Sequence, residues 1–165
     1  GNASLLKPLR DYVVKQAQAT PRFIKLLTEN SLHWKVPFNW FGSLETKELD
    51  GKKIIDIKMQ GTAIVVDAAR IYSLAHGIAA VNTRERLAAV GRALNVSEAE
   101  SMGWIASFEY LQTLRLAAQI DGHAIGGNPN AVDVEQLNSV DKTILRESLS
   151  KVRNLQQQLE LDYVR

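Results

Sequence analysis

The sequence predicts an all-α protein, a helical bundle of about six helices with one small β-hairpin or extended insertion near residues 44–58. Three observations lead to this fold class. Apolar side chains recur at helical spacing through most of the chain. Helix-capping residues stand in front of several of these segments, as Asn82 and Ser97 do. Asp50-Gly51, a typical hairpin turn, separates two short segments with strand-forming residues. Helices with apolar faces and so few strands pack on one another as a bundle.

The segment from Thr62 to Gly77 is so apolar that we expect it at the centre of the bundle. Its main apolar arc repeats at helical spacing and consists of Ile64, Val65, Ala68, Ile71, Tyr72 and Ala75. Gly77 is placed to end this helix in a left-handed conformation. Asn82, with Glu85 three residues later, predicts the capped start of the next helix.

Further helices are predicted on both sides of this central segment. Their expected positions are 5–19, 21–33, a helix opening at 82, 98–121 and 139–163. Thr20, Ser97 and Ser139 are the expected caps of three of them. The expected buried faces include Leu5, Leu6, Leu9, Tyr12, Val13 and Ala17 in the first helix, and Met102, Ile105, Phe108, Leu111 and Leu114 in the longest. The glycine- and asparagine-rich segment 122–133 is predicted to be a loop.

Composition favours one compact, soluble, cytoplasmic unit. The 165 residues are 45% hydrophobic and 23% charged, without an apolar run long enough to cross a bilayer. The formal charge of +2 is too small to favour a large nucleic-acid interface. Cysteine is absent, and the three histidines, His33, His76 and His123, are too scattered to predict a zinc site. Because the chain begins Gly1-Asn2 without methionine, we expect either a piece of a longer protein or a processed chain.

The usual enzyme signatures are missing, so the candidate site residues are arginines. Gly42-Ser43 followed by Glu48 and Asp50 resembles a nucleotidyltransferase catalytic pattern, but these carboxylates run straight into the predicted turn. Trp40 and Phe41 are expected to anchor their loop on the core, with stacking on a ligand as the alternative.

Several arginines lie in otherwise apolar helical contexts, and they have two interpretations. Arg70 follows Asp67 by three residues, Arg86 lies in a first turn, and Arg115 precedes Gln119 by one turn. Guanidinium groups that converge would form a pocket for phosphate or carboxylate. The alternative is that each makes a local salt bridge and only holds helices together.

Several segments together resemble the putative nucleotidyltransferase substrate-binding domain family. They are DIK at 56–58, IVVDAARIYSLAHGI at 64–78, NTRERL at 82–87, LRLAAQ at 114–119 and the closing pattern of Arg146, Val152, Arg153 and Gln156. The similarity extends over about residues 22–163. Residues 1–20 resemble the final helix of a preceding nucleotidyltransferase-like domain, which leaves 21–165 as the helical substrate-binding domain.

The resemblance implies a part of a bacterial, cytoplasmic signalling protein in which CBS and cyclic-nucleotide-binding modules often precede the catalytic domain. That domain would use magnesium and a nucleoside triphosphate, while this chain would shape the cleft for a nucleotide or an acceptor protein and be inactive alone. The residues that match polar positions of the family pattern are Lys58, Asp67, Arg70, Thr83, Arg86, Arg115, Gln119 and Arg153. Ala117-Ala118 departs from the pattern and removes positive charge near Arg115. A protein-interaction or homodimerisation module remains the alternative function.

Overall fold

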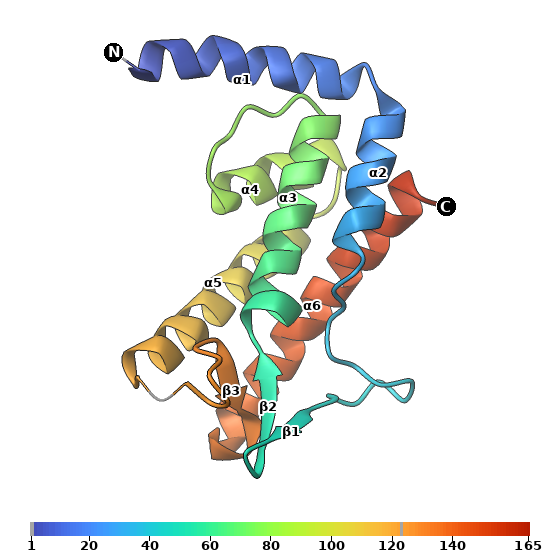
Figure 1. Cartoon of the computed structure of the whole chain (residues 1–165). Coiled ribbons are helices and arrows are strands. Elements are labelled where there is room, and N and C mark those ends of the chain that lie inside the picture. Colours follow the sequence, from blue (N-terminus) through green and yellow to red (C-terminus); the bar gives the residue numbers. More distant parts are fainter. Residues whose placement is uncertain (1, 123) are drawn as a thin grey trace.

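The computed structural model describes residues 2–122 and 124–165, and within them the all-α prediction is confirmed. Six α-helices pack around one another beside a small sheet (Figure 1). The helices are α1 (Asn2–Gln18), α2 (Pro21–Ser31), α3 (Ala63–Ala75), α4 (Thr83–Ala93), α5 (Glu98–Ile120) and α6 (Ser139–Tyr163). The prediction for His123 lies outside the described residues.

Helix α3 is the central element, as predicted. It contacts α1, α2, α4 and α6, and Ile64, Val65, Ala68, Ile71 and Tyr72 on it are buried. A short π-helix over Lys58–Thr62 leads into it, with the Thr62 amide donating to the Ile57 carbonyl at 2.9 Å. Gly77 adopts a φ of +69° just after the helix, which confirms its role as the stop.

The predicted hairpin is confirmed, and it belongs to a three-stranded antiparallel sheet. Strands β1 (Lys47–Leu49) and β2 (Lys52–Asp56) are joined by Asp50 and Gly51, whose φ values of +52° and +72° are those of a tight hairpin turn. The third strand, β3 (Ala131–Asp133), pairs with β2 within the segment that was predicted to be only a loop. Three residues give no periodic signal, and the partner strand lies far away in the chain.

The helix caps are partly as predicted. The side chain of Asn82 accepts from the Glu85 amide at 2.8 Å, and that of Ser97 from the Glu100 amide at 3.1 Å. The prediction of Ser139 as a cap was wrong by one residue, because Asn138 is the extended residue and accepts from the Asp141 amide. Thr20 precedes α2, but its hydroxyl donates back to the Gln16 carbonyl of α1.

Most of the predicted buried face of α1 is exposed, and so is one residue of the predicted face of α5. Among the side chains of α1 that the structure describes, Val14 and Ala17 are buried, whereas Leu5, Leu6, Leu9, Tyr12 and Val13 are exposed. Figure 1 shows α1 lying across one end of the bundle, so the other elements all lie to one side of it. Met102 is also exposed, because it lies at the edge of the contact between α4 and α5.

The contact between α4 and α5 depends on a glycine, and we expect Gly91→Ala to lower the free energy of unfolding by about 1–2 kcal/mol. A Cβ at Gly91 would lie 2.5 Å from the Cβ of Ser101, so the two helices would have to move apart. This cost exceeds the better helix propensity of alanine. Urea denaturation measures the change. Adding Ser101→Gly to the Gly91→Ala variant should recover the lost stability, because it removes the Cβ that the new methyl group would meet.

Gly103→Ala in α5 is the matched control for that substitution. A Cβ there meets only side-chain carbons of Lys151, at 3.9 and 4.0 Å. It should therefore stabilise the protein by about 0.5–1 kcal/mol through helix propensity. Equal stability of the two alanine variants would contradict the close packing of α4 on α5.

Candidate functional site

The eight candidate residues from the sequence occupy separate places in the fold. Asp67, Arg70, Thr83 and Arg86 lie on α3 and the first turn of α4. Arg115 and Gln119 lie near the C-terminal end of α5, which Figure 1 shows well away from α4. Arg153 lies on α6, and Lys58 is an exposed residue of the π-helix. The structure therefore brings Arg70 and Arg86 to one region but leaves Arg115 outside it.

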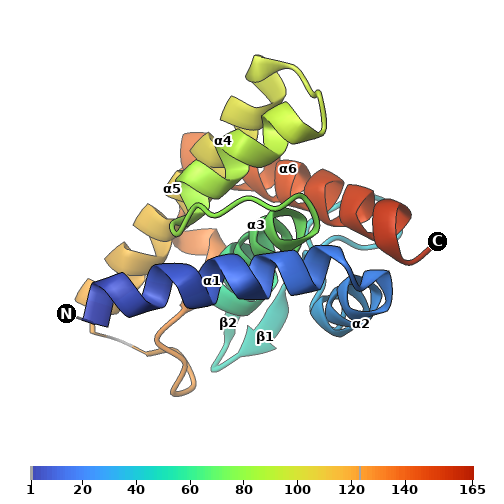
Figure 2. The same cartoon turned by 90° about the horizontal axis from the view of Figure 1, so that it is seen from above.

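A third arginine, Arg10 of α1, joins Arg70 and Arg86. Its Nη1 donates to the Ala79 carbonyl at 3.2 Å, and Arg86 Nε donates to the neighbouring Ala80 carbonyl at 2.9 Å. These carbonyls belong to the segment that links α3 to α4, over which α1 lies in Figures 1 and 2. We call Arg10, Arg70 and Arg86 the arginine cluster. No local pattern singles out Arg10, because the carbonyl that it contacts is 69 residues away in the chain.

The arginine cluster is poorly neutralised by the protein itself. Burial of the guanidinium lowers the pKa of Arg86, and the positive charges of Arg70 and Arg10 lower it further. In the described part of the chain, none of the ion pairs includes an arginine of the cluster. Like charges held together with only Asp67, of the described carboxyl groups, beside Arg70 favour the binding of an anion.

Asp67 is the carboxyl group next to Arg70. Its burial raises its pKa, while the charge of Arg70 acts in the opposite direction. Asp67 and Arg70 also line a small hollow of about 260 Å³ with Asn30 and Ser31 of α2. Thr83, half-buried at the first position of α4, completes the predicted residues in this region.

Arg115 and Gln119 hold a loop in place. Arg115 Nε and Gln119 Nε2 both donate to Asn130 Oδ1, at 2.8 and 3.1 Å. The Asn130 amide donates to Asn128 Oδ1, and Asn128 Nδ2 donates to Asp56 Oδ2 at 2.8 Å. These hydrogen bonds connect α5 to the loop before β3 and to β2. Arg115 and Gln119 therefore have a structural role.

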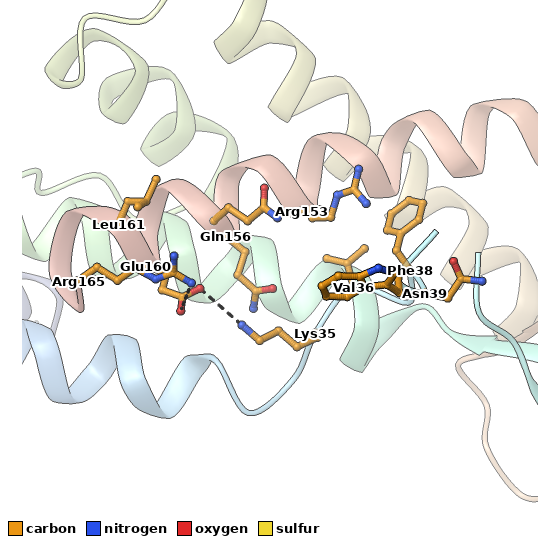
Figure 3. A pocket seen from close by; sticks show the side chains of 11 residues that line it. Lys35, Val36, Phe38, Asn39, Arg153, Gln156, Glu160, Leu161 and Arg165 are labelled. Atoms are coloured by element: carbon orange, nitrogen blue, oxygen red, sulfur yellow. Dashed lines mark hydrogen bonds and ion pairs between the residues drawn. The ribbon is translucent and has the colours of Figure 1, made fainter. Parts of the chain in front are cut away.

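Arg153 lies at a separate hollow of about 520 Å³ between α6 and the segment after α2 (Figure 3). We call it the α6 hollow; it is lined by Lys35, Val36, Phe38, Asn39, Trp40, Arg153, Gln156, Gln157, Glu160, Leu161 and Arg165. The Arg153 guanidinium lies over the Phe38 ring, 4.3 Å from its centroid. Glu160 pairs with Lys35 at 3.8 Å and with Arg165 at 3.3 Å.

The prediction that Trp40 and Phe41 anchor their loop on the core was wrong. Their exposed fractions are 96% and 88%. The loop is held instead by Asn39, whose Oδ1 accepts from the Phe41 and Ser43 amides at 2.9 and 3.0 Å. These hydrogen bonds between the Asn39 side chain and the backbone hold the turn, so the turn does not depend on burial of Trp40 and Phe41.

Two absences hold for residues 2–122 and 124–165. No three acidic or histidine side chains are grouped so that they could hold a metal ion. No helix there has both the length and the apolarity needed to cross a bilayer.

The fold is mostly helical, and it brings three arginines of α1, α3 and α4 to one region. A family model described as putative nucleotidyltransferase substrate binding domain matches residues 21–163. The chain therefore belongs to this family, as the resemblance indicated. No curated protein and no solved structure matches the chain. Helix α1 lies before the matched region.

Proposed function

We propose that the chain is the substrate-binding part of a nucleotidyltransferase and that the arginine cluster holds an anionic group of the substrate. The observation that carries this proposal is the meeting of three arginines without an ion pair among the described residues. Nucleotidyl transfer needs mainly positioning and charge stabilisation, and guanidinium groups supply both. The magnesium ion and the nucleoside triphosphate would be held largely by a catalytic domain outside this chain.

The hydrogen bonds of Arg10 and Arg86 to the segment between α3 and α4 leave some of their N–H donors free for a ligand. Arg86 uses Nε for its bond to the Ala80 carbonyl, so its two terminal nitrogens can point at a ligand. Arg10 uses one terminal nitrogen and keeps the other. Arg70, which is exposed, supplies a third guanidinium group, and Asp67 lies beside it. A phosphate of the nucleotide or of the acceptor would receive these donors and relieve the repulsion between the arginines.

The exposed face of α1 supports a preceding nucleotidyltransferase-like domain as the partner. Leu5, Leu9 and Tyr12 are exposed at 72%, 59% and 61%, and a helix with so few contacts is marginal without further packing. A catalytic domain packed there would lie next to Arg10 and hence next to the arginine cluster. The CBS and cyclic-nucleotide-binding modules, the signalling role and the cytoplasmic location of a bacterial parent protein belong to the same proposal.

Titration calorimetry of the chain with pyrophosphate and with each of the four nucleoside triphosphates, with and without Mg²⁺, tests the arginine cluster. We expect binding that weakens at least roughly tenfold in Arg86→Gln and in Arg70→Gln, as the loss of one charged hydrogen bond predicts. Arg92→Gln is the control, because Arg92 is an exposed residue of the same helix outside the cluster. Absence of binding by all these anions, or equal affinity in all three variants, would contradict the proposal.

A second candidate function is homodimerisation, and the same apolar face of α1 favours it. Two copies pairing through Leu5, Leu9 and Tyr12 would bury side chains that are exposed in one chain. Sedimentation equilibrium would then show a mass that rises with concentration, and Leu9→Glu would keep the protein monomeric. A constant monomer mass at all concentrations removes this candidate and leaves the face of α1 to the catalytic domain.

A further inference from the structure

The α6 hollow is a second site that the proposed function does not use. It shares no lining residue with the hollow beside Arg70, and it contains none of the arginine cluster. Its volume of about 520 Å³ lies in the range of small-molecule sites. In Figure 3 it runs along α6, from Phe38, Asn39 and Arg153 at one end to Leu161 and Arg165 at the other. Three of its features together indicate one class of ligand.

The first feature is a fixed guanidinium fork. The Cζ atom of Arg153 lies over the Phe38 ring, 4.3 Å from its centroid, and this cation–π contact holds the guanidinium beside the α6 hollow. Its N–H donors make no hydrogen bond or ion pair to any described residue. A stacked arginine with a free edge is suited to a phosphate group. Lys35 and Arg165 are less available, because both pair with Glu160.

The second feature is a side-chain acceptor on α6. Gln156 is only 4% exposed, and its Nε2 donates to the Trp34 carbonyl at 2.8 Å. Because a carbonyl can only accept, this bond fixes which way the amide of Gln156 faces. No described residue donates a hydrogen bond to its Oε1, and Gln156 is one of the residues that line the α6 hollow. Such an acceptor favours a ligand that brings an N–H group.

The third feature is an aromatic surface at the rim. Trp40 lines the α6 hollow and is 96% exposed. Its loop is rigid, because Asn39 Oδ1 accepts from two amides and the Asn39 amide donates to the Ser43 carbonyl at 2.9 Å. These bonds hold the backbone around Trp40, and the exposed indole leaves its faces open to a ligand. A planar ring can stack on them.

We propose that the α6 hollow binds a nucleotide. The phosphate would lie on the free edge of Arg153, the base would stack on Trp40, and an amino group of the base would donate to Gln156 Oε1. Arg153 and Gln156 lie three residues apart on α6 and face the same way, so one ligand can reach both. A base with an exocyclic amino group fits better than one without, because only the amino group can donate to Gln156 Oε1.

Calorimetric titration of the chain with adenosine 5′-monophosphate, without Mg²⁺, tests this proposal. We expect Arg153→Gln and Trp40→Ala each to weaken binding at least roughly tenfold, within the range measured for stacked bases and charged hydrogen bonds. Lys151→Gln and Phe41→Ala are the matched controls and should bind as the unchanged protein does. Each is an exposed neighbour outside the lining of the α6 hollow. Melting curves of all variants check that they are folded.

A second ligand isolates the role of Gln156. Purine riboside 5′-monophosphate lacks only the amino group of adenine, and it should bind roughly threefold to tenfold more weakly, because the hydrogen bond to Gln156 Oε1 is then lost. Equal affinity of the two nucleotides, or equal weakening by Trp40→Ala and Phe41→Ala, would overturn the proposal. So would a failure of adenosine monophosphate to bind. Binding abolished by Arg86→Gln but not by Arg153→Gln would place the nucleotide in the arginine cluster, which overturns this proposal and supports the earlier one.

Discussion

Replacement of Leu149 by alanine is expected to lower the free energy of unfolding by about 2–5 kcal/mol, the largest loss among the substitutions considered. Leu149 is fully buried on α6. Its Cδ2 lies 3.7 Å from the Cβ position of Gly61 in the π-helix, and Leu111 of α5 reaches the same glycine at 3.5 Å. The side chain thus fills the space where three elements meet. Alanine would leave a cavity there, because rigid helices cannot collapse around it.

Leu116→Ala is the control for the Leu149 substitution. It removes the same atoms from α5, at a position that is 56% exposed. Its effect should stay within about 0.5 kcal/mol. Urea denaturation of both variants with a shared slope measures the difference. A loss of less than about 1 kcal/mol in Leu149→Ala would mean that α6 does not pack on the π-helix as described.

Tyr72→Phe is expected to lower the free energy of unfolding by about 1.5–3 kcal/mol at neutral pH, as the loss of a hydrogen bond to a charged group predicts. Tyr72 is buried on α3, and its hydroxyl donates to Asp162 Oδ2 of α6 at 2.6 Å. Its ring also packs against Tyr163, with centroids 5.5 Å apart. Phenylalanine keeps the ring contacts, so the difference reports the hydroxyl bond that joins the central helix to the last one.

The effect of Tyr72→Phe should shrink at high pH. Burial is the main cause that raises the pKa of Tyr72, and the hydrogen bond and charge of Asp162 raise it further. The tyrosine therefore ionises first in the unfolded chain, and its contribution to stability is complete below about pH 10 and is lost as the pH rises further. The stability difference between the two proteins should fall by up to about 1.4 kcal/mol per pH unit above that point.

Tyr163 also changes the stability of the protein at high pH. Burial, followed by the charge of Asp162, raises its pKa to about 12. It therefore also favours unfolding above pH 10, but it does so in both the unchanged protein and Tyr72→Phe. The comparison cancels its contribution. A stability difference that stays constant from pH 8 to pH 11 would contradict the buried hydrogen bond of Tyr72.

Local patterns in the sequence were enough to predict the helices and the hairpin. Apolar spacing marked the buried face of α3, and Asn82, Ser97 and Gly77 marked helix ends, because these signals depend on residues within one or two turns. The pattern failed for α1. An apolar stripe shows that a face favours burial, but it does not show whether the covering surface belongs to the same chain.

The candidate residues were only partly predictable for the same reason. The sequence singled out Arg70 and Arg86 by their place in apolar helices, and the fold brings them to one region. It equally singled out Arg115, which the fold commits to Asn130. Nothing local distinguishes an arginine with a structural partner from one without, because that partner comes from another segment.

By itself, then, the sequence determined the helical class, the central position of α3, the hairpin at Asp50-Gly51 and the family. Only the tertiary structure decided that Arg10 joins Arg86, that β3 pairs with β2, and that Gln156 reaches the Trp34 carbonyl. These contacts join residues that are remote in the chain. Helix periodicity and caps are short-range properties, whereas a binding site depends on which faces the packed helices turn toward each other.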